Sequence, residues 1–199
     1  MTQPCDLLYS PASPFVRKVC VVAAETGVTL SHTPATASPL EALPEITAAN
    51  PLGKVPALRV PGGETLYDSP VICRYLGEGT TVYPTGADGW RALRREALAD
   101  GLMDAALLAR YETALRPEAL RWPDWTEGQM TKIARALEAM EADLRSVTTP
   151  DIGDIATGCA LGYLDFRYAT LDWRAAHPRL AVWAEPLLAR PSFRDTAPA

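Results

Sequence analysis

The sequence changes its pattern once along its length, and this change restricts the fold more than any other feature. Before residue 80, short apolar runs alternate with helical ones, whereas after residue 90 only helical periodicity is found. Residues 79–89 (GTTVYPTGADG) lie between these parts, and their glycines, proline and polar residues are typical of a linker. We therefore predict an α/β domain over residues 1–80, followed by an all-helical domain over residues 88–199.

The first domain begins with a predicted strand, helix and strand. Residues 5–9 (CDLLY) predict a buried strand, and residues 14–26 repeat apolar side chains at helical spacing. Pro14 suits the first helical turn, where a missing N–H costs nothing, and Gly27 suits the end of the helix. A second strand is predicted over residues 28–33. This order and length favour a right-handed parallel βαβ unit.

A hairpin and a helix complete the predicted α/β domain. Residues 55–61 and 64–67 predict two short strands, joined by a Gly-Gly pair that is typical of a two-residue turn. Ser69, followed by a proline, predicts the N-cap of a helix over residues 69–77. The domain is thus a βαβ unit followed by a ββα unit.

Apolar stripes predict the helices of the second domain, at residues 90–115, 124–147, 152–168 and 178–189. Asp151 and Asp154 precede the third of these stripes. Their spacing resembles a capping box, with aspartate in place of the usual glutamate.

Charge and composition exclude several classes of protein. The 199 residues include 19 Lys and Arg against 24 Asp and Glu, a net charge of −5, which argues against a nucleic-acid or polybasic membrane-surface binder. No apolar segment approaches the roughly 18 to 20 residues that a membrane span needs. The first residues lack a basic region followed by a long apolar core, so we expect no secretory signal and a cytosolic location.

The cysteines and histidines predict no metal site. The cysteines form no Cys-x-x-Cys pair, and His32 and His177 lie far apart in sequence. Each cysteine stands in an apolar stretch, so we expect reduced, buried thiols at all of them. They are Cys5, Cys20, Cys73 and Cys159.

Ser10-Pro11-Ala12-Ser13 is the first candidate for chemistry, because a thioredoxin-like fold carries its Cys-x-x-Cys pair at this place. Serines replace both cysteines, which argues against dithiol redox chemistry. Ser13 stands at a helix N-terminus, where unpaired N–H groups and the helix dipole favour a negative charge. Its hydroxyl either donates a hydrogen bond to a bound thiolate or only caps the helix. A nucleophilic role is disfavoured because no histidine is near in sequence to act as a base.

Two further segments are candidates for ligand binding. Val55-Pro56 follows a turn at the start of a strand, where a cis bond leaves the backbone of Val55 free to pair with a peptide-like ligand. Asp68-Ser69 lies at a strand-to-helix turn. These residues either cap the helix or form a recess in which Asp68 meets an ammonium group and Ser69 a carboxylate.

Five segments together resemble the soluble glutathione S-transferase family. They are SPFVRKV, NPLGKVPAL, YDS, PDIGDIATGCAL and HPRLAVWAEPLLARPSF, in the family's order and over essentially the whole chain. The resemblance is strongest to bacterial members of the serine type and extends to plant members with an SPF motif. It implies a thioredoxin-like N-terminal domain, an all-helical C-terminal domain, a homodimer, glutathione as co-substrate and no metal.

The resemblance also implies residue roles. Those expected to bind glutathione are Phe15, Lys54, Val55, Pro56, Asp68 and Ser69. A cis Val55-Pro56 bond lets the backbone of Val55 pair with the cysteinyl part, Asp68 and Ser69 meet the γ-glutamyl end, and Lys54 lies near the glycine carboxylate. The resemblance assigns Ser13 as the hydroxyl that faces the thiol, with the subfamilies that use an earlier serine favouring Ser10. A cysteine-type member is disfavoured because Ser13 is not cysteine, and Tyr9 is a weaker alternative than either serine.

The implied activity is attack of a glutathione thiolate on a small hydrophobic electrophile, as in detoxification. A glutathione-binding regulatory or structural protein without turnover is an alternative, as is a glutathione-dependent isomerase, dehalogenase or peroxidase. The electrophile is expected between the domains. Met103, Leu107 and Tyr111 share one helix face there and either line that site or pack in the helical core, and Phe166 and Trp173 leave the same choice open.

Overall fold

A four-stranded sheet forms the N-terminal part of the molecule. The computed structural model describes residues 5–41 and 43–198. The strands are β1 (Cys5–Tyr9), β2 (Leu30–Pro34), β3 (Ala57–Arg59) and β4 (Thr65–Leu66). Their spatial order is β2-β1-β3-β4, with β1 parallel to β2 and antiparallel to β3, and β3 antiparallel to β4. The predicted βαβ and ββα units are therefore confirmed, and the fold is thioredoxin-like.

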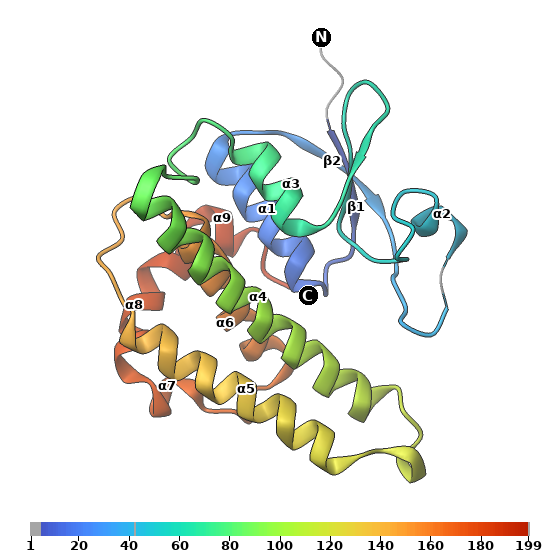
Figure 1. Ribbon diagram of the computed structural model, residues 1–199, viewed down its shortest axis with the longest axis vertical. Helices are drawn as coiled ribbons and strands as arrows, with labels where there is room; N and C mark the ends of the chain where they lie inside the picture. Colours follow the sequence, from blue (N-terminus) through green and yellow to red (C-terminus); the bar gives the residue numbers. More distant parts are fainter. Residues whose placement is uncertain (1–4, 42, 199) are drawn as a thin grey trace.

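Helices cover both faces of this sheet. α1 (Pro14–Thr26) and α3 (Ser69–Gly77) pack against each other on one face, and the short α2 (Pro44–Thr47) lies on the other side (Figure 1). Leu7 belongs to the main core, whereas the next residue, Leu8, packs in a second cluster with Ile46 of α2. Because successive side chains of a strand point to opposite faces, a strand covered on both faces carries apolar residues in succession, as β1 does at Leu7 and Leu8.

The rest of the chain is helical, as predicted. Its elements are α4 (Gly86–Ala114), the 3-10 turn η1 (Glu118–Leu120), α5 (Pro123–Ala142), α6 (Ile152–Arg167), α7 (Trp173–Ala176), α8 (Pro178–Leu188) and α9 (Pro191–Arg194). Every residue from Ile152 to Leu164 is buried, because α6 packs against α1, α4 and α8 (Figure 1). An apolar surface on all sides marks such a central helix.

The capping box at the start of α6 is confirmed. Asp151 Oδ1 accepts hydrogen bonds from the N–H groups of Gly153 (2.9 Å) and Asp154 (3.1 Å), and Asp154 Oδ2 accepts one from the Asp151 N–H (3.0 Å). Asp151 also pairs with Arg95 at 2.6 Å and with Arg145 at 3.0 Å. The box thus fixes both the helix start and its attachment to α4.

The segment predicted as a linker, residues 79–89, packs against the helical part of the molecule. Val82 and Tyr83 are buried, and the Val82 carbonyl accepts a hydrogen bond of 2.9 Å from the Ile152 N–H. The segment is docked onto the start of α6, and α4 begins at Gly86 rather than at Trp90. The local composition indicated a turn, but it did not indicate that this turn packs against the start of α6.

Three smaller expectations are also corrected. The hairpin turn is longer than two residues, since the Val60 N–H bonds the Glu64 carbonyl and leaves residues 61–63 as the loop. The N-cap of α3 is Asp68, and Ser69 is its first helical residue. Helix α5 ends at Ala142, short of the predicted residue 147.

α1 is the element through which the two parts of the molecule meet. The Lys18 side chain is completely buried, and its Nζ lies 3.0 Å from Glu96 Oε1 and 2.7 Å from Asp100 Oδ2 on α4. The preceding residue, Arg17, donates from its Nη2 to the carbonyl of Phe193, near the C-terminal end of the chain (3.0 Å). One continuous apolar core includes residues of both parts.

Three of the four cysteines are buried thiols, whereas Cys5 at the start of β1 is only half-buried, so the expectation of four buried thiols is wrong there. Over the described ranges, no helix is long and apolar enough to cross a membrane. The same residues contain no group of three or more His, Cys, Asp or Glu side chains that could hold a metal ion.

Candidate functional site

The sheet register brings the candidate segments to one edge of the sheet. Leu8 of β1 faces Ala57 of β3, so the residues after β1 lie beside Val55-Pro56. Leu58 of β3 faces Leu66 of β4, so continuing that register sets Pro56 beside Asp68. Segments that are far apart in sequence therefore converge at the N-termini of α1 and α3.

Ser13 is the N-cap of α1. Its Oγ accepts a hydrogen bond of 3.3 Å from the Val16 N–H, and its own N–H bonds the Ser10 carbonyl at 3.1 Å. The cap bond uses a lone pair of the hydroxyl and leaves the hydroxyl proton available. The capping interpretation is confirmed, and it does not exclude donation of that proton to a ligand.

Ser10 and Tyr9 are less suited than Ser13 to stabilising an anion. Ser10 follows β1 and lies outside the first turn of α1. The Tyr9 ring stacks on His32, with centroids 4.5 Å apart. Burial raises the pKa of Tyr9, the opposite of the shift that helps a phenol to stabilise a thiolate.

Val55-Pro56 is a cis peptide bond, as expected. Among the described residues, neither the N–H nor the C=O of Val55 has a hydrogen-bond partner. The preceding turn is held by the buried Asn50, whose Nδ2 donates to the Lys54 carbonyl and whose Oδ1 accepts from the Leu52 N–H, both at 3.0 Å. Sequence reasoning identified this turn but missed Asn50 as the side chain that holds it.

Asp68 is exposed and makes no side-chain capping bond to α3, while Ser69 beside it is buried. Within the part of the chain that the structure describes, Asp68 has no ion-pair partner. Burial raises the pKa of Asp104 on α4, the Lys54 cation opposes that rise and the Asp68 carboxylate adds to it. Asp104 therefore lies within electrostatic reach of Lys54 and Asp68, and the sequence pattern did not single it out.

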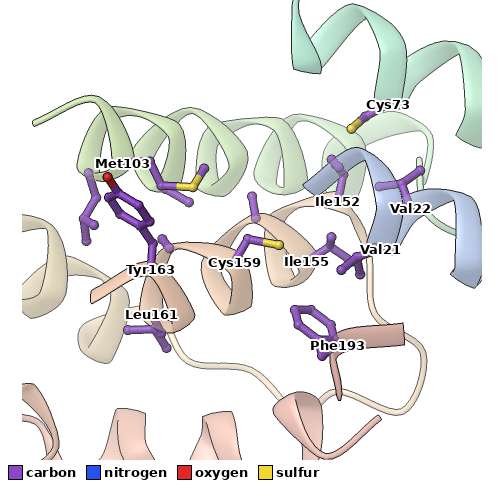
Figure 2. Packing of buried hydrophobic residues seen from close by; sticks show 14 of the residues in the cluster. Val21, Val22, Cys73, Met103, Ile152, Ile155, Cys159, Leu161, Tyr163 and Phe193 are labelled. Carbon is purple, nitrogen blue, oxygen red and sulfur yellow. The ribbon is translucent and has the colours of Figure 1, made fainter. Parts of the chain in front are cut away.

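Ser13 borders a narrow gap, too small for a water molecule, between the start of α1 and the helical part. Its lining includes Arg17, Cys159 and Tyr163, with Pro198 near the C-terminal end. Burial raises the pKa of Cys159 to about 11, so this thiol stays protonated at neutral pH. In Figure 2 the sulfur of Cys159 points toward Val21 on α1, within the apolar core. The cysteine near Ser13 is therefore a packing residue.

The expected electrophile wall is partly corrected. Met103 is fully buried and packs between α4 and α6, and Trp173 is buried with its Nε1 donating to Asp165 at 2.8 Å. Both belong to the core. Leu107, Tyr111 and Phe166 are half-buried and remain candidates for the wall.

Comparison with known proteins decides the family. The profile of the glutathione S-transferase N-terminal domain matches residues 12–78, and that of the C-terminal domain matches residues 123–185. The chain belongs to the glutathione S-transferase family. Its architecture, a thioredoxin-like domain followed by a helical one, is the fold expected from the resemblance.

Relatives of this glutathione S-transferase family member cover nearly its whole length. The uncharacterized GST-like protein YibF of Escherichia coli K12 is 38% identical over 96% of this chain and 98% of its own. A glutathione transferase family member from Pseudomonas fluorescens Pf-5, with bound glutathione, is 44% identical, with a TM-score of 0.94 over 98% of this chain and 99% of its own. A structure from the same bacterium with bound S-(propanoic acid)-glutathione is 44% identical, with a TM-score of 0.89 over 98% and 100%.

Proposed function

We propose that this chain is a glutathione transferase of the serine type, in which Ser13 stabilises the glutathione thiolate for attack on a small electrophile. The observation that carries the proposal is the N-cap position of Ser13, with its hydroxyl proton free, beside the unpaired backbone of Val55. Membership of the family and the bound glutathione of a relative that is 44% identical support it.

The converging segments suit the parts of a glutathione molecule. The free N–H and C=O of Val55, presented beside cis-Pro56, match the peptide groups of the cysteinyl part, as when a strand is added to a sheet edge. Asp68 offers an unpaired carboxylate to the γ-glutamyl ammonium, and the first turn of α3 at Ser69 offers N–H groups to its carboxylate. Lys54 is exposed on the approach to this edge and suits the glycine carboxylate.

Phe15 has a packing role in this assignment. Its ring is half-buried and contacts the main core from the first turn of α1, directly after Ser13-Pro14. We assign Phe15 to the wall beside the bound thiol.

A single hydroxyl at a helix N-terminus is sufficient to make the thiolate. A free thiol with a pKa of about 8.5 is only about 3% ionised at pH 7. Lowering that pKa by about two units needs roughly 2.7 kcal/mol. A charge-assisted hydrogen bond contributes about 1.5 to 3 kcal/mol and a helix terminus about 0.3 to 1 kcal/mol. Ser13 and the N-terminus of α1 together therefore reach the required stabilisation.

The test compares Ser13→Ala with Ser10→Ala. We expect Ser13→Ala to lower turnover by about tenfold or more with little change in glutathione affinity, because the thiolate loses its charge-assisted bond. It also raises the pKa of the bound thiol, which is measured by the ultraviolet absorption of the thiolate against pH. Ser10→Ala is the matched control and changes neither quantity. The reverse result, with Ser10 controlling the thiol, would move the assignment to Ser10.

Turnover itself is measured against a panel of electrophiles, with product analysis to separate transfer from isomerisation, dehalogenation and peroxide reduction. Tight glutathione binding without turnover on any of these would favour a regulatory or structural role.

The assembly, the domain limits and the location complete the proposal. Exposed apolar side chains lie on α3 and near the start of α4, at Val71, Tyr75 and Trp90, and suit the surface that a second copy of the chain covers in a homodimer. Sedimentation at micromolar concentration tests this, and a monomer would exclude it. The domains at residues 1–80 and 88–199 and a cytosolic location stay predictions.

A further inference from the structure

A buried cation stands beside Ser13 on the same helix. Arg17 lies one turn further along α1, and its N–H bonds the Ser13 carbonyl at 3.0 Å. Residues at this spacing share one face of a helix. Arg17 is only 8% exposed, and it lines the same narrow gap as Ser13 and Tyr163. The Arg17 side chain is therefore part of the surroundings of the Ser13 hydroxyl.

The charge of Arg17 is not balanced by a carboxylate. Among the described residues, Arg17 and Lys18 are the buried cations. Lys18 pairs with Glu96 and Asp100, whereas Arg17 pairs with no acidic side chain in that part of the chain and donates to the Phe193 carbonyl at 3.0 Å. Solvent compensates an exposed arginine that has no partner, but a buried cation without one is costly. Burial thus distinguishes Arg17 from the exposed arginines of the surface.

The Arg17 guanidinium also keeps an unsatisfied donor. Its Nε is buried, and no acceptor within the described ranges bonds it. The Phe193 ring lies with its centroid 5.8 Å from the Arg17 Cζ, a contact that favours a cation but does not neutralise it. Opposite charges attract more strongly where water is excluded. An anion bound at Ser13 therefore recovers part of the cost of burying Arg17.

Helix α6 leaves room for the guanidinium. A Cβ atom at position 162 would overlap with Arg17 Nη1, so only glycine fits there without a shift of the arginine. Gly162 lies within α6 and has no positive φ, and glycine is unfavourable in a helix interior compared with alanine. Gly158, one turn earlier, leaves room in the same way for the Phe193 ring, which lies against α6 (Figure 2). The space for Arg17 is thus built into the helix that faces it.

The other titratable side chains of the gap do not cancel this charge. Cys159 and Tyr163 line the gap with Arg17. Burial raises the pKa of Cys159 to about 11 and that of Tyr163 to about 12, so both are neutral at pH 7. The Arg17 cation opposes the rise at Cys159, which shows the direction of its effect on a neighbouring thiol.

We propose that Arg17 stabilises the glutathione thiolate at Ser13 through space, as a second cationic source of stabilisation beside the Ser13 hydroxyl and the helix N-terminus. This inference rests on the proposed glutathione transferase function. Arginine stays protonated in proteins, so its field is present at every working pH. It favours the thiolate over the thiol and lowers the pKa of the bound thiol. Arg17 acts on this charge at a distance and is not a catalytic residue.

Titration of the bound thiol tests the inference separately from turnover. The ultraviolet absorption of the thiolate is followed against pH with glutathione bound to the wild-type chain, to Arg17→Gln and to Arg17→Met. We expect each neutral replacement to raise the pKa of the bound thiol by about half a unit or more, as for the loss of a partly shielded unit charge. Gln keeps a donor for the Phe193 carbonyl and Met keeps apolar packing, so either folded variant decides the outcome. Affinity for S-methylglutathione, which has no ionisable thiol, stays unchanged.

Arg190→Gln is the matched control. Arg190 also ties the C-terminal segment to α1, but it pairs with Glu25 in the last turn of that helix. This turn lies roughly 18 Å from Ser13 at about 1.5 Å per residue. The control removes an arginine from the same junction and leaves the pKa of the bound thiol unchanged. Arg17→Lys keeps the charge without the planar fork of donors, so it retains part of the lowered pKa.

A purely structural role of Arg17 gives a different result. Loss of the bond to the Phe193 carbonyl lowers the free energy of unfolding and weakens glutathione binding equally at every pH. The pKa of the bound thiol then stays at its wild-type value. That result, or an equal rise of the pKa in Arg190→Gln, overturns the inference, while a lowered thiol pKa in the wild type upholds the proposed function. A wild-type chain that does not bind glutathione, or that binds it without lowering the thiol pKa, overturns both.

Discussion

α3 and α6 both begin at an aspartate, and the two aspartates are used in opposite ways. Asp151 at the start of α6 is buried, caps two backbone N–H groups and pairs with two arginines. Asp68 at the start of α3 is exposed, makes no side-chain capping bond and has no ion-pair partner among the described residues. The same residue type at the same helix position is thus fully engaged in one region and free in the other.

The contrast indicates how structural and ligand-binding polar groups differ in this fold. At α6, the chain satisfies its own polar groups, because the helix start is buried and an unsatisfied group there is costly. At the edge of the sheet, Asp68 and the Val55 backbone have no partner within the described chain, which suits them to the ligand proposed above. A polar group with free bonding capacity beside another such group is therefore the better guide to the binding site.

The largest effect that tests this comparison is on folding stability. Asp151→Ala removes two capping bonds and takes the carboxylate partner away from Arg95, whose side chain is largely buried. We therefore expect the free energy of unfolding to fall by about 3 to 5 kcal/mol. Urea unfolding followed by circular dichroism measures it. Asp172→Ala is the control, because Asp172 makes one capping bond to the exposed, short α7 and should cost about 1 kcal/mol. Equal losses of unfolding free energy in the two variants would show that the burial and ion pairs of Asp151 add nothing to an ordinary cap.

Asp68→Ala gives the opposite signature. We expect unfolding to change by less than about 0.5 kcal/mol, because the side chain bonds nothing in the described chain. Glutathione affinity falls by about ten- to a hundredfold, since a charge-assisted bond to the ammonium is lost. Calorimetry and thermal unfolding on the same sample measure both. A destabilised variant that still binds glutathione normally would make Asp68 a structural cap and refute the recess.

The smallest expected effect is a pH-dependent change in stability at the ion pair between Glu25 and Arg190. The Arg190 guanidinium donates two hydrogen bonds to Glu25 and, with the Ser192 hydroxyl, holds the pKa of that carboxyl below its ordinary value, although burial opposes this. The lowered folded-state pKa means that the pair stabilises the fold above the ordinary glutamate range. This contribution is lost as the pH falls through the folded-state pKa.

We therefore expect Glu25→Gln to cost about 1 kcal/mol at pH 6, discounted because Arg190 is partly exposed. The difference from wild type then disappears on acidification toward pH 3. Urea titrations across this pH range measure it. A difference that stays constant with pH would show that packing, and not the charge, ties α1 to the C-terminal segment.

Much of the fold was predictable because its signals are local. The helix from Pro14 to Thr26 begins and ends where proline and glycine indicate, and the capping box at Asp151 is the one that the spacing predicts. The burial of the segment around Val82 was not predicted, because it depends on α6, which lies far away in sequence.

The residues of the candidate site were likewise predicted where their signals are local and missed where they are not. Ser13, Val55-Pro56 and Asp68-Ser69 were identified from turn and cap positions together with the family resemblance, since each is a short-range feature. Asn50 and Asp104 were missed, because nothing in their own neighbourhood distinguishes them from ordinary turn and helix residues.

Periodicity, caps and motifs are set by neighbouring residues, so they specified the long helices, the strands, the family and the candidate segments, but not the short η1, α7 and α9. Only the tertiary structure decided which polar groups are already satisfied. Lys18 and Arg17 are adjacent cations on α1, yet Lys18 is held by Glu96 and Asp100, whereas Arg17 meets a backbone carbonyl. Whether a charge is neutralised or left for a ligand depends on partners that are distant in sequence, and folding alone brings them into contact.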